Sequence, residues 1–255
     1  MSEPLFTGVG VALATLFDEA GEADPKATAG HAATLVELGV RAVVVAGSTG
    51  EAAALTSEER LDLLSEVRRA VGAEVPVVAG TGAPSARQAA VLTRAARDAG
   101  ADAVLALCPP RTTDPRPYYD AVAEAAGGLP ARAYHFPQTA PPGIPVEALP
   151  DLPVQGMKDS SGDPERLLSE LEVFDRPLYV GAAMLVLLAG SLGIAGAILA
   201  VANADPEHAI AAFAGDPAAQ RALLAAHRRV KARFPFGLKD AIADRFATSR
   251  ATRLG

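Results

Sequence analysis

The sequence predicts an α/β fold, namely one (β/α)₈ TIM barrel with a short C-terminal helical extension. The chain has 255 residues, which is the usual length of a single barrel of this kind. Eight short apolar runs alternate with helical patterns along it. Most of these runs are apolar on both faces, as is typical of parallel strands that are covered on both sides.

The eight apolar runs are the expected strands of the barrel. Half of the residues are hydrophobic and only 5% are aromatic, so the core must be built mainly from Ala, Val and Leu. The runs span residues 9–15, 42–47, 75–82, 103–109, 131–137, 154–158, 178–183 and 196–203.

Helix start and stop signals lie between these runs. Thr56 or Ser57 is the expected N-cap of a helix that has acidic residues in its first turn and stops at Gly72. Asp163 is expected to cap a later helix that has Pro164 at its first position. These signals support the strand–helix alternation.

The last part of the chain differs, because its pattern is helical throughout from Pro206 onward. We therefore expect the barrel over residues 1–204 and the helical extension, packed on it, over 205–255, within one structural domain. The uncharged stretch 178–204 is long enough for a membrane helix. Its several glycines divide it, however, and favour a strand, a short buried helix, a turn and a strand.

Composition excludes several classes of function. The formal net charge of −7 argues against a nucleic-acid groove, which needs a basic face. The single cysteine, Cys108, cannot form an internal disulfide and fits a reducing cytosol. The first residues lack the basic region of a secretory signal. We expect a cytoplasmic protein with no nucleic-acid and no membrane partner.

In such a barrel the site lies at the C-terminal ends of the strands. Gly47, Ser48 and Thr49 form a possible anion cradle, although a tight turn is the simpler interpretation. Tyr134 lies in the fifth run and could be an ordinary core tyrosine. Lys158 ends the sixth run, where the alternative is a surface lysine or a partner of the next residue.

Together these groups indicate a particular chemistry. A free lysine has a pKa of about 10.4, so roughly one molecule in 2,500 is neutral at pH 7. Burial in an apolar barrel lowers the pKa of Lys158 and favours the neutral amine, which attacks ketones to form a Schiff base. The Tyr134 hydroxyl can shuttle the proton, and the hydroxyls of Ser48 and Thr49 can hold the carboxylate of a 2-oxo acid.

Three motifs in this order and spacing, "GSTGEAAALTSEER", "YHFP" and "GMKDSSGD", resemble those of the dihydrodipicolinate synthase and N-acetylneuraminate lyase family. The resemblance implies a class I Schiff-base lyase in which Lys158 forms the imine and Tyr134 is the acid/base. It also implies that Ser48 and Thr49 bind the carboxylate, that no metal or organic cofactor is needed, and that the protein is a homodimer or homotetramer. The segment 184–188 is then core or subunit contact, and we expect core.

The sequence departs from the family pattern at positions that select the substrate. Thr139 aligns with an arginine of the biosynthetic synthases, and Arg111 aligns near their relay tyrosine. His135 replaces an asparagine, and we expect it to be a packed neutral histidine. We hypothesise that Arg111 binds a second anionic group of another substrate, the alternative being an exposed loop arginine.

The leading function is therefore a lyase or aldolase that acts on pyruvate or a related 2-oxo acid. Two alternatives use the same imine, namely the 4-hydroxy-tetrahydrodipicolinate synthase itself and a 2-keto-3-deoxy sugar-acid dehydratase. A fourth hypothesis is a 2-oxo acid binding barrel that has lost turnover.

Overall fold

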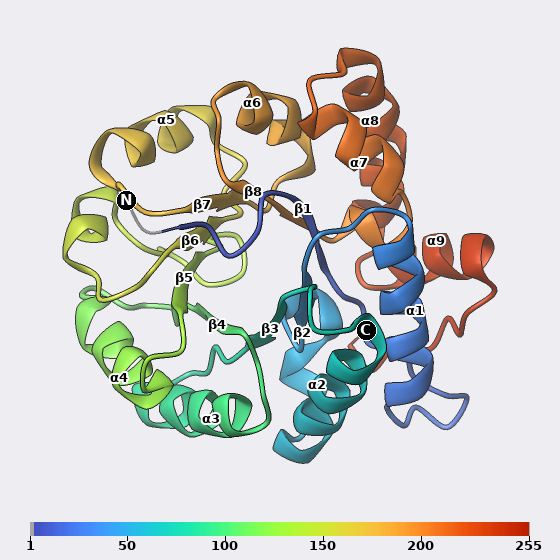
Figure 1. The fold of residues 1–255 in the computed structure, drawn as a ribbon, viewed down its shortest axis with the longest axis horizontal. Coiled ribbons are helices and arrows are strands. Elements are labelled where there is room, and N and C mark those ends of the chain that lie inside the picture. Colours follow the sequence, from blue (N-terminus) through green and yellow to red (C-terminus); the bar gives the residue numbers. More distant parts are fainter. Residues whose placement is uncertain (1–2, 255) are drawn as a thin grey trace.

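The computed structural model describes residues 3–254 and contains a closed barrel of eight parallel strands, in the order of the sequence (Figure 1). The predicted fold class is confirmed. The strands are β1 (Gly8–Ala12), β2 (Val43–Val45), β3 (Val77–Gly80), β4 (Ala103–Leu107), β5 (Ala131–His135), β6 (Met157–Asp159), β7 (Leu178–Val180) and β8 (Gly196–Leu199).

Helices surround the strands, and α7, α8 and α9 lie together on one side of the barrel, near α1 (Figure 1). The helices are α1 (Pro25–Glu37), α2 (Ser57–Val71), α3 (Ala86–Asp98), α4 (Arg116–Ala126), α5 (Pro164–Val173), α6 (Val186–Ser191), α7 (Pro206–Phe213), α8 (Pro217–Ala232) and α9 (Phe236–Phe246). The predicted caps are present: Thr56 forms a capping box with Glu59, and Asp163 caps α5.

One strand–helix alternation is incomplete. Between β5 and β6 the chain forms only a 3₁₀ segment, η3 (Val146–Asp151), in place of an α-helix. Pro150 lies inside this segment and Pro145 is its N-cap. Proline lacks the backbone donor of an α-helix and clashes with the preceding turn, so it restricts this connection to a short 3₁₀ form.

Some strand boundaries differ from the expectation. The sixth run was expected over 154–158, but β6 begins at Met157, so Lys158 is its central residue and not its last. The eighth run ends at Leu199, before the 3₁₀ segment η5 (Val201–Asn203). There the Asn203 side chain accepts from the backbone N–H of Ala14 and donates to the carbonyl of Ala12, at 2.9 and 2.7 Å. These bonds connect the end of β8 to that of β1.

The uncharged stretch 178–204 divides as expected into β7, α6 and β8. Within residues 3–254, no helix is both long and apolar enough to cross a membrane. The expectation of a core segment at 184–188 is partly wrong. Leu185 and Val186 are buried, but Met184 is 38% exposed.

The floor of the barrel is closed by aromatic side chains. Phe6 stacks on Tyr179 with ring centroids 4.6 Å apart. A Cβ atom at Gly10 would lie 2.9 Å from the Phe6 ring, and one at Gly196 would lie 3.2 Å from it. Glycine at these positions leaves room for this ring, which fills the N-terminal end of the barrel, and the catalytic end of a barrel of this kind is the other one.

Candidate active site

Lys158 and Tyr134 are cross-strand neighbours inside the barrel. The parallel register pairs Tyr134 of β5 with Lys158 of β6. Both side chains are buried, and the Lys158 Nζ atom lies 4.4 Å from the centroid of the Tyr134 ring. Because side chains alternate along a strand, this pairing directs both groups to the interior face.

The Lys158 amine is held in an apolar site. Burial lowers its pKa to about 7, and within residues 3–254 no hydrogen bond or ion pair engages its ammonium. Gly181, which follows β7, provides the space for it. A Cβ atom at Gly181 would lie 2.7 Å from Lys158 Cε and would overlap the Ser160 hydroxyl. The lysine is therefore an available nucleophile near neutral pH.

The Tyr134 hydroxyl accepts a hydrogen bond from the Ser160 hydroxyl at 3.4 Å. Burial raises the pKa of Tyr134 to about 12, and hydrogen bonding by Ser160 and Ser48 partly offsets this effect. The phenol is thus protonated at neutral pH and can donate. Ser160 was not predicted as a site residue, although the "DSSG" sequence after Lys158 offered a signal for it.

The Gly47–Ser48–Thr49 loop forms a 3₁₀ turn at the end of β2, in which the Gly50 N–H donates to the Gly47 carbonyl at 3.0 Å. Thr49 is buried, Ser48 is half-buried, and Ser48 is close enough to Tyr134 to affect its pKa. A Cβ atom at Gly50 would lie 2.9 Å from the Leu13 carbonyl oxygen. The structure thus brings Ser48 together with Tyr134 and Lys158.

Arg111 lies apart from this group. It follows β4 in an exposed loop, with a left-handed φ of 63°, and its N–H donates to the Pro141 carbonyl at 2.7 Å. Among the described residues, no hydrogen bond or ion pair joins its guanidinium to Lys158, Tyr134 or Ser48. Thr139 is also exposed.

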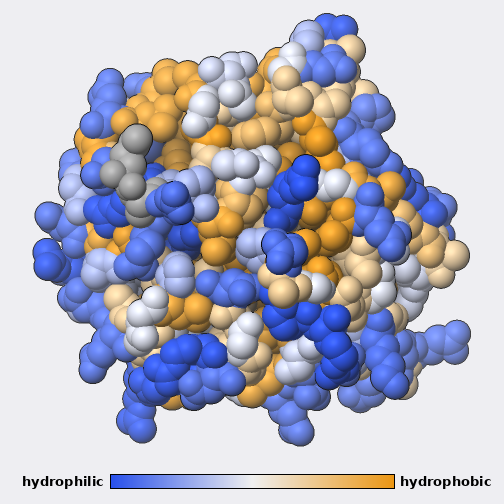
Figure 2. Space-filling view, in the orientation of Figure 1, coloured by the Kyte–Doolittle hydropathy of each residue, from blue (hydrophilic) through white to orange (hydrophobic). Residues whose placement is uncertain are grey.

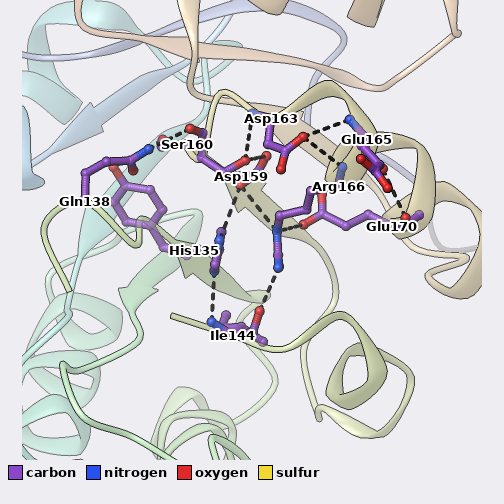
Figure 3. Close-up of polar contacts among 12 residues, drawn as sticks. His135, Gln138, Ile144, Asp159, Ser160, Asp163, Glu165, Arg166 and Glu170 are labelled. Carbon is purple, nitrogen blue, oxygen red and sulfur yellow. Dashed lines mark hydrogen bonds and ion pairs between the residues drawn. The ribbon is translucent and has the colours of Figure 1, made fainter. Parts of the chain in front are cut away.

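A second cross-strand pair, one residue further along β5 and β6, has its side chains on the opposite face of the sheet and contacts α5 (Figure 3). His135 pairs with Asp159, and its Nε2 atom is 4.0 Å from Asp159 Oδ1. The His135 Nδ1 atom accepts the Ile144 N–H at 2.8 Å. Burial, assisted by the charge of Arg166, lowers the pKa of His135 to about 4. The expectation of a packed neutral histidine agrees with this environment.

Arg166 and Glu170 of α5 complete this outer cluster (Figure 3). Arg166 Nε lies 2.7 Å from Glu170 Oε1 and 3.8 Å from Asp159 Oδ1. Burial, together with the charge of Asp159, raises the pKa of Glu170 to about 8. Asp159 also accepts the Ser161 N–H and hydroxyl, at 2.9 and 2.7 Å. The sequence alone did not indicate this cluster.

Known proteins match this chain over most of its length. The profile of the dihydrodipicolinate synthetase family matches residues 5–231. The chain belongs to this family. It is 34% identical over 233 residues to a 4-hydroxy-tetrahydrodipicolinate synthase of Pseudomonas aeruginosa, covering 86% of this chain and 80% of that protein. It is 35% identical over 209 residues to an uncharacterised DapA-like lyase of Halobacterium salinarum, covering 78% and 68%.

Solved structures of the family have the same fold. A dihydrodipicolinate synthase from Bacillus anthracis superimposes with a TM-score of 0.90 at 28% identity, covering 100% of this chain and 92% of that one. A prophage protein of the dihydrodipicolinic acid synthase family from E. coli K12, solved with pyruvate, gives a TM-score of 0.89 at 25% identity, covering 98% and 92%. The predicted family and the predicted class, a lyase of the dihydrodipicolinate synthase type, are confirmed.

Proposed function

We propose that this protein is a lyase that forms a Schiff base between Lys158 and pyruvate or a related 2-oxo acid. The observation that carries the proposal is the buried Lys158 amine, with its pKa lowered to about 7, beside the Tyr134 phenol. A lysine with no counter-ion in an apolar site is poised as a nucleophile and not as a structural cation.

Each residue has a defined role in this proposal. The Lys158 amine attacks the ketone carbon, and loss of water from the carbinolamine gives the iminium. The Tyr134 hydroxyl, bonded to Ser160, donates and recovers the protons. Gly47, Ser48 and Thr49 hold the substrate carboxylate through hydroxyl and N–H donors. The iminium acidifies the adjacent carbon, and loss of a proton from that carbon gives the enamine, whose carbon is the nucleophile of an aldol step. No metal or organic cofactor is required.

Two observations bear on the acceptor, which is the molecule that the carbon of the 2-oxo acid attacks. The relative from P. aeruginosa is named a 4-hydroxy-tetrahydrodipicolinate synthase, which favours the biosynthetic reaction. Thr139 and Arg111 stand where the family pattern has an arginine and a tyrosine, which favours another acceptor. Because Arg111 lies in an exposed loop, its binding of an anionic group of that acceptor stays a prediction. Condensation of pyruvate with aspartate semialdehyde would identify the synthase. Release of pyruvate and an aldehyde from 2-oxo sugar acids would identify the aldolase, whereas the dehydratase would release water from them.

Reductive trapping tests the proposed imine. Incubation with pyruvate and borohydride should add one reduced adduct, and peptide mapping should find it on Lys158. Lys158→Arg should take up no label and should lose activity by about a thousandfold or more, because a guanidinium cannot form the imine. A label on another lysine, or full activity of Lys158→Arg, would contradict the proposal.

We also infer a cytoplasmic homodimer or homotetramer. Apolar side chains are exposed on α5 and at α6, and Figure 2 shows apolar surface in this region. They are Leu168, Leu171, Val173, Met184 and Leu192. A patch of this kind supports an interface between copies. Cys108, the single cysteine of the sequence, is free and buried, which is compatible with a reducing compartment. Light scattering should give a mass of two or four chains, and a monomer would contradict the inference.

A further inference from the structure

The 248–254 segment returns from α9 to the loop at the end of β2, so the red end of the chain lies beside α2 in Figure 1. Arg253 anchors it there through several bonds. Its guanidinium donates to both oxygens of Glu59, at 2.6 and 3.0 Å, and to the carbonyls of Ala54 and Gly21, at 3.0 and 2.6 Å. The side chain is 20% exposed, so these bonds are only partly screened by water.

Glu51 receives this segment directly. Its Oε2 atom accepts the N–H groups of Arg253 and Leu254, each at 2.8 Å. Glu51 is fully buried and has a left-handed φ of 57°, which is uncommon for a residue other than glycine. It is also the residue that follows Gly50 in the loop of Ser48 and Thr49. The side-chain bonds therefore hold the backbone conformation that ends this loop.

Lys239 of α9 contacts the same carboxylate. Its Nζ atom lies 3.5 Å from Glu51 Oε1, and both side chains are fully buried. It also donates to the carbonyls of Thr15 and Ala251, the latter at 3.0 Å. The Thr15 hydroxyl in turn donates to the Gly50 carbonyl at 2.7 Å. Two chains of contacts thus connect α9 and the 248–254 segment with the residues on either side of Gly50.

We propose that Glu51, Lys239 and Arg253 are positioning residues that hold the Ser48–Thr49 loop in the geometry that binds the substrate carboxylate. This inference rests on the proposed function of that loop. It predicts that loosening the segment weakens recognition of the carboxylate and leaves the amine of Lys158 reactive, since Lys158 lies on β6 and makes none of these contacts. Residues far from the reacting atoms would then determine affinity for the 2-oxo acid.

Arg253→Met tests the proposal, with Arg250→Met as its matched control. Arg250 lies in the same segment but pairs with Asp240 and Asp244, and within residues 3–254 no hydrogen bond or ion pair joins it to Glu51. We expect Arg253→Met to raise KM for pyruvate about 10- to 100-fold, with kcat within about threefold, because misplacement of a binding group mainly reduces affinity. Arg250→Met should stay within about twofold of the wild type. Equal KM values for the two variants would overturn the proposal.

A substrate without a carboxylate separates positioning from general damage. Trapping of acetone with borohydride reports Lys158 reactivity without the carboxylate loop. Arg253→Met should lose pyruvate trapping at low concentration by about tenfold or more, while acetone trapping should stay unchanged. Parallel loss with both ketones would contradict a positioning role. If Arg253→Met does not fold, Arg253→Lys, which keeps the charge but not the planar fork, should give a smaller shift of the same sign.

The two proposals fail in different ways. A wild-type protein that traps neither ketone on Lys158 contradicts the proposed function itself. A wild-type protein that traps pyruvate, with an Arg253→Met variant that traps it equally well, leaves the function intact and overturns only the role of the 248–254 segment.

Discussion

Two lysines are buried in this barrel, and their surroundings differ. Lys158 faces the Tyr134 ring inside the barrel, and within residues 3–254 no carboxylate pairs with it. Lys239 lies outside the barrel lumen with Glu51 and two backbone carbonyls around it. Burial lowers the pKa of both, to about 7 for Lys158 and about 8 for Lys239.

The comparison shows that a lowered pKa does not by itself identify a catalytic lysine. The Glu51 carboxylate raises the pKa of Lys239 and opposes the effect of burial, whereas no such group opposes it at Lys158. The donors of Lys239 are directed at protein acceptors, whereas within residues 3–254 no protein acceptor engages the Lys158 amine. Partners, rather than burial, separate a structural lysine from a nucleophile.

Replacing each lysine by methionine should affect the free energy of unfolding differently. Lys239→Met leaves the Glu51 carboxylate buried without its cation, and we expect it to lower the free energy of unfolding by about 3–5 kcal/mol. Lys158→Met removes an unpaired buried amine, so it should not lower stability although it abolishes the imine. Urea unfolding measures both. Equal destabilisation by the two variants would contradict the comparison, and Lys239→Met combined with Glu51→Gln should recover much of the loss.

Filling the space beside Lys158 should impair the site that this lysine shares with Ser160. Gly181→Ala places a Cβ atom 2.7 Å from Lys158 Cε and against Ser160, so we expect kcat/KM to fall about 10- to 100-fold. Gly30→Ala is the control, since a Cβ atom there, on an exposed face of α1, meets nothing within 4 Å. Normal kinetics of Gly181→Ala would show that the amine does not need this space.

The pH dependence should report the lowered pKa of Lys158. With a pKa of about 7, the rate of imine trapping should rise with pH up to about 7 and then level off. Between about pH 7 and 10.4 the unfolded chain binds more protons at this lysine than the folded protein, so stability should rise with pH in that range. Lys158→Met should show a smaller rise. A trapping rate that keeps increasing to pH 10 would contradict the lowered pKa.

Of these substitutions, one in the outer cluster of His135, Asp159, Arg166 and Glu170 should change the rate of imine formation least. Glu170 has a raised pKa of about 8, so the folded protein binds more protons there than the unfolded chain between about pH 4.5 and 8. This group therefore lowers stability as pH rises through that range. Glu170→Gln should change stability by about 1 kcal/mol or less at pH 5, gain relative to the wild type at pH 8, and keep the trapping rate. A large loss of trapping would place Glu170 in the catalytic machinery.

The sequence was sufficient to predict the barrel and to nominate Lys158 and Tyr134, because both depend on local pattern. Apolar runs on both faces indicate buried parallel strands, and a polar residue inside such a run stands out. The prolines around η3 were also visible, and their effect on that connection could have been foreseen. Boundaries were less predictable, since β6 begins only where Met157 starts to pair with its neighbours.

The contacts around Lys239 could not be predicted in this way. Glu51 and Arg253 are separated by 202 positions, and neither belongs to a periodic pattern that marks its partner. Their pairing depends on the tertiary fold, which brings the segment after α9 back to the loop that follows β2. Ser160 is an intermediate case, because it adjoins Lys158 in sequence but acquires its role only through the bond to Tyr134 on another strand.

The aromatic floor made by Phe6 and Tyr179 has a consequence for the order of events. Because these rings fill the N-terminal end, the Lys158 amine is approached from the C-terminal ends of the strands. Under the proposed reaction the keto acid would bind first and form the imine, and the aldehyde would then react from the same side. In the reverse direction the aldehyde would leave before the keto acid.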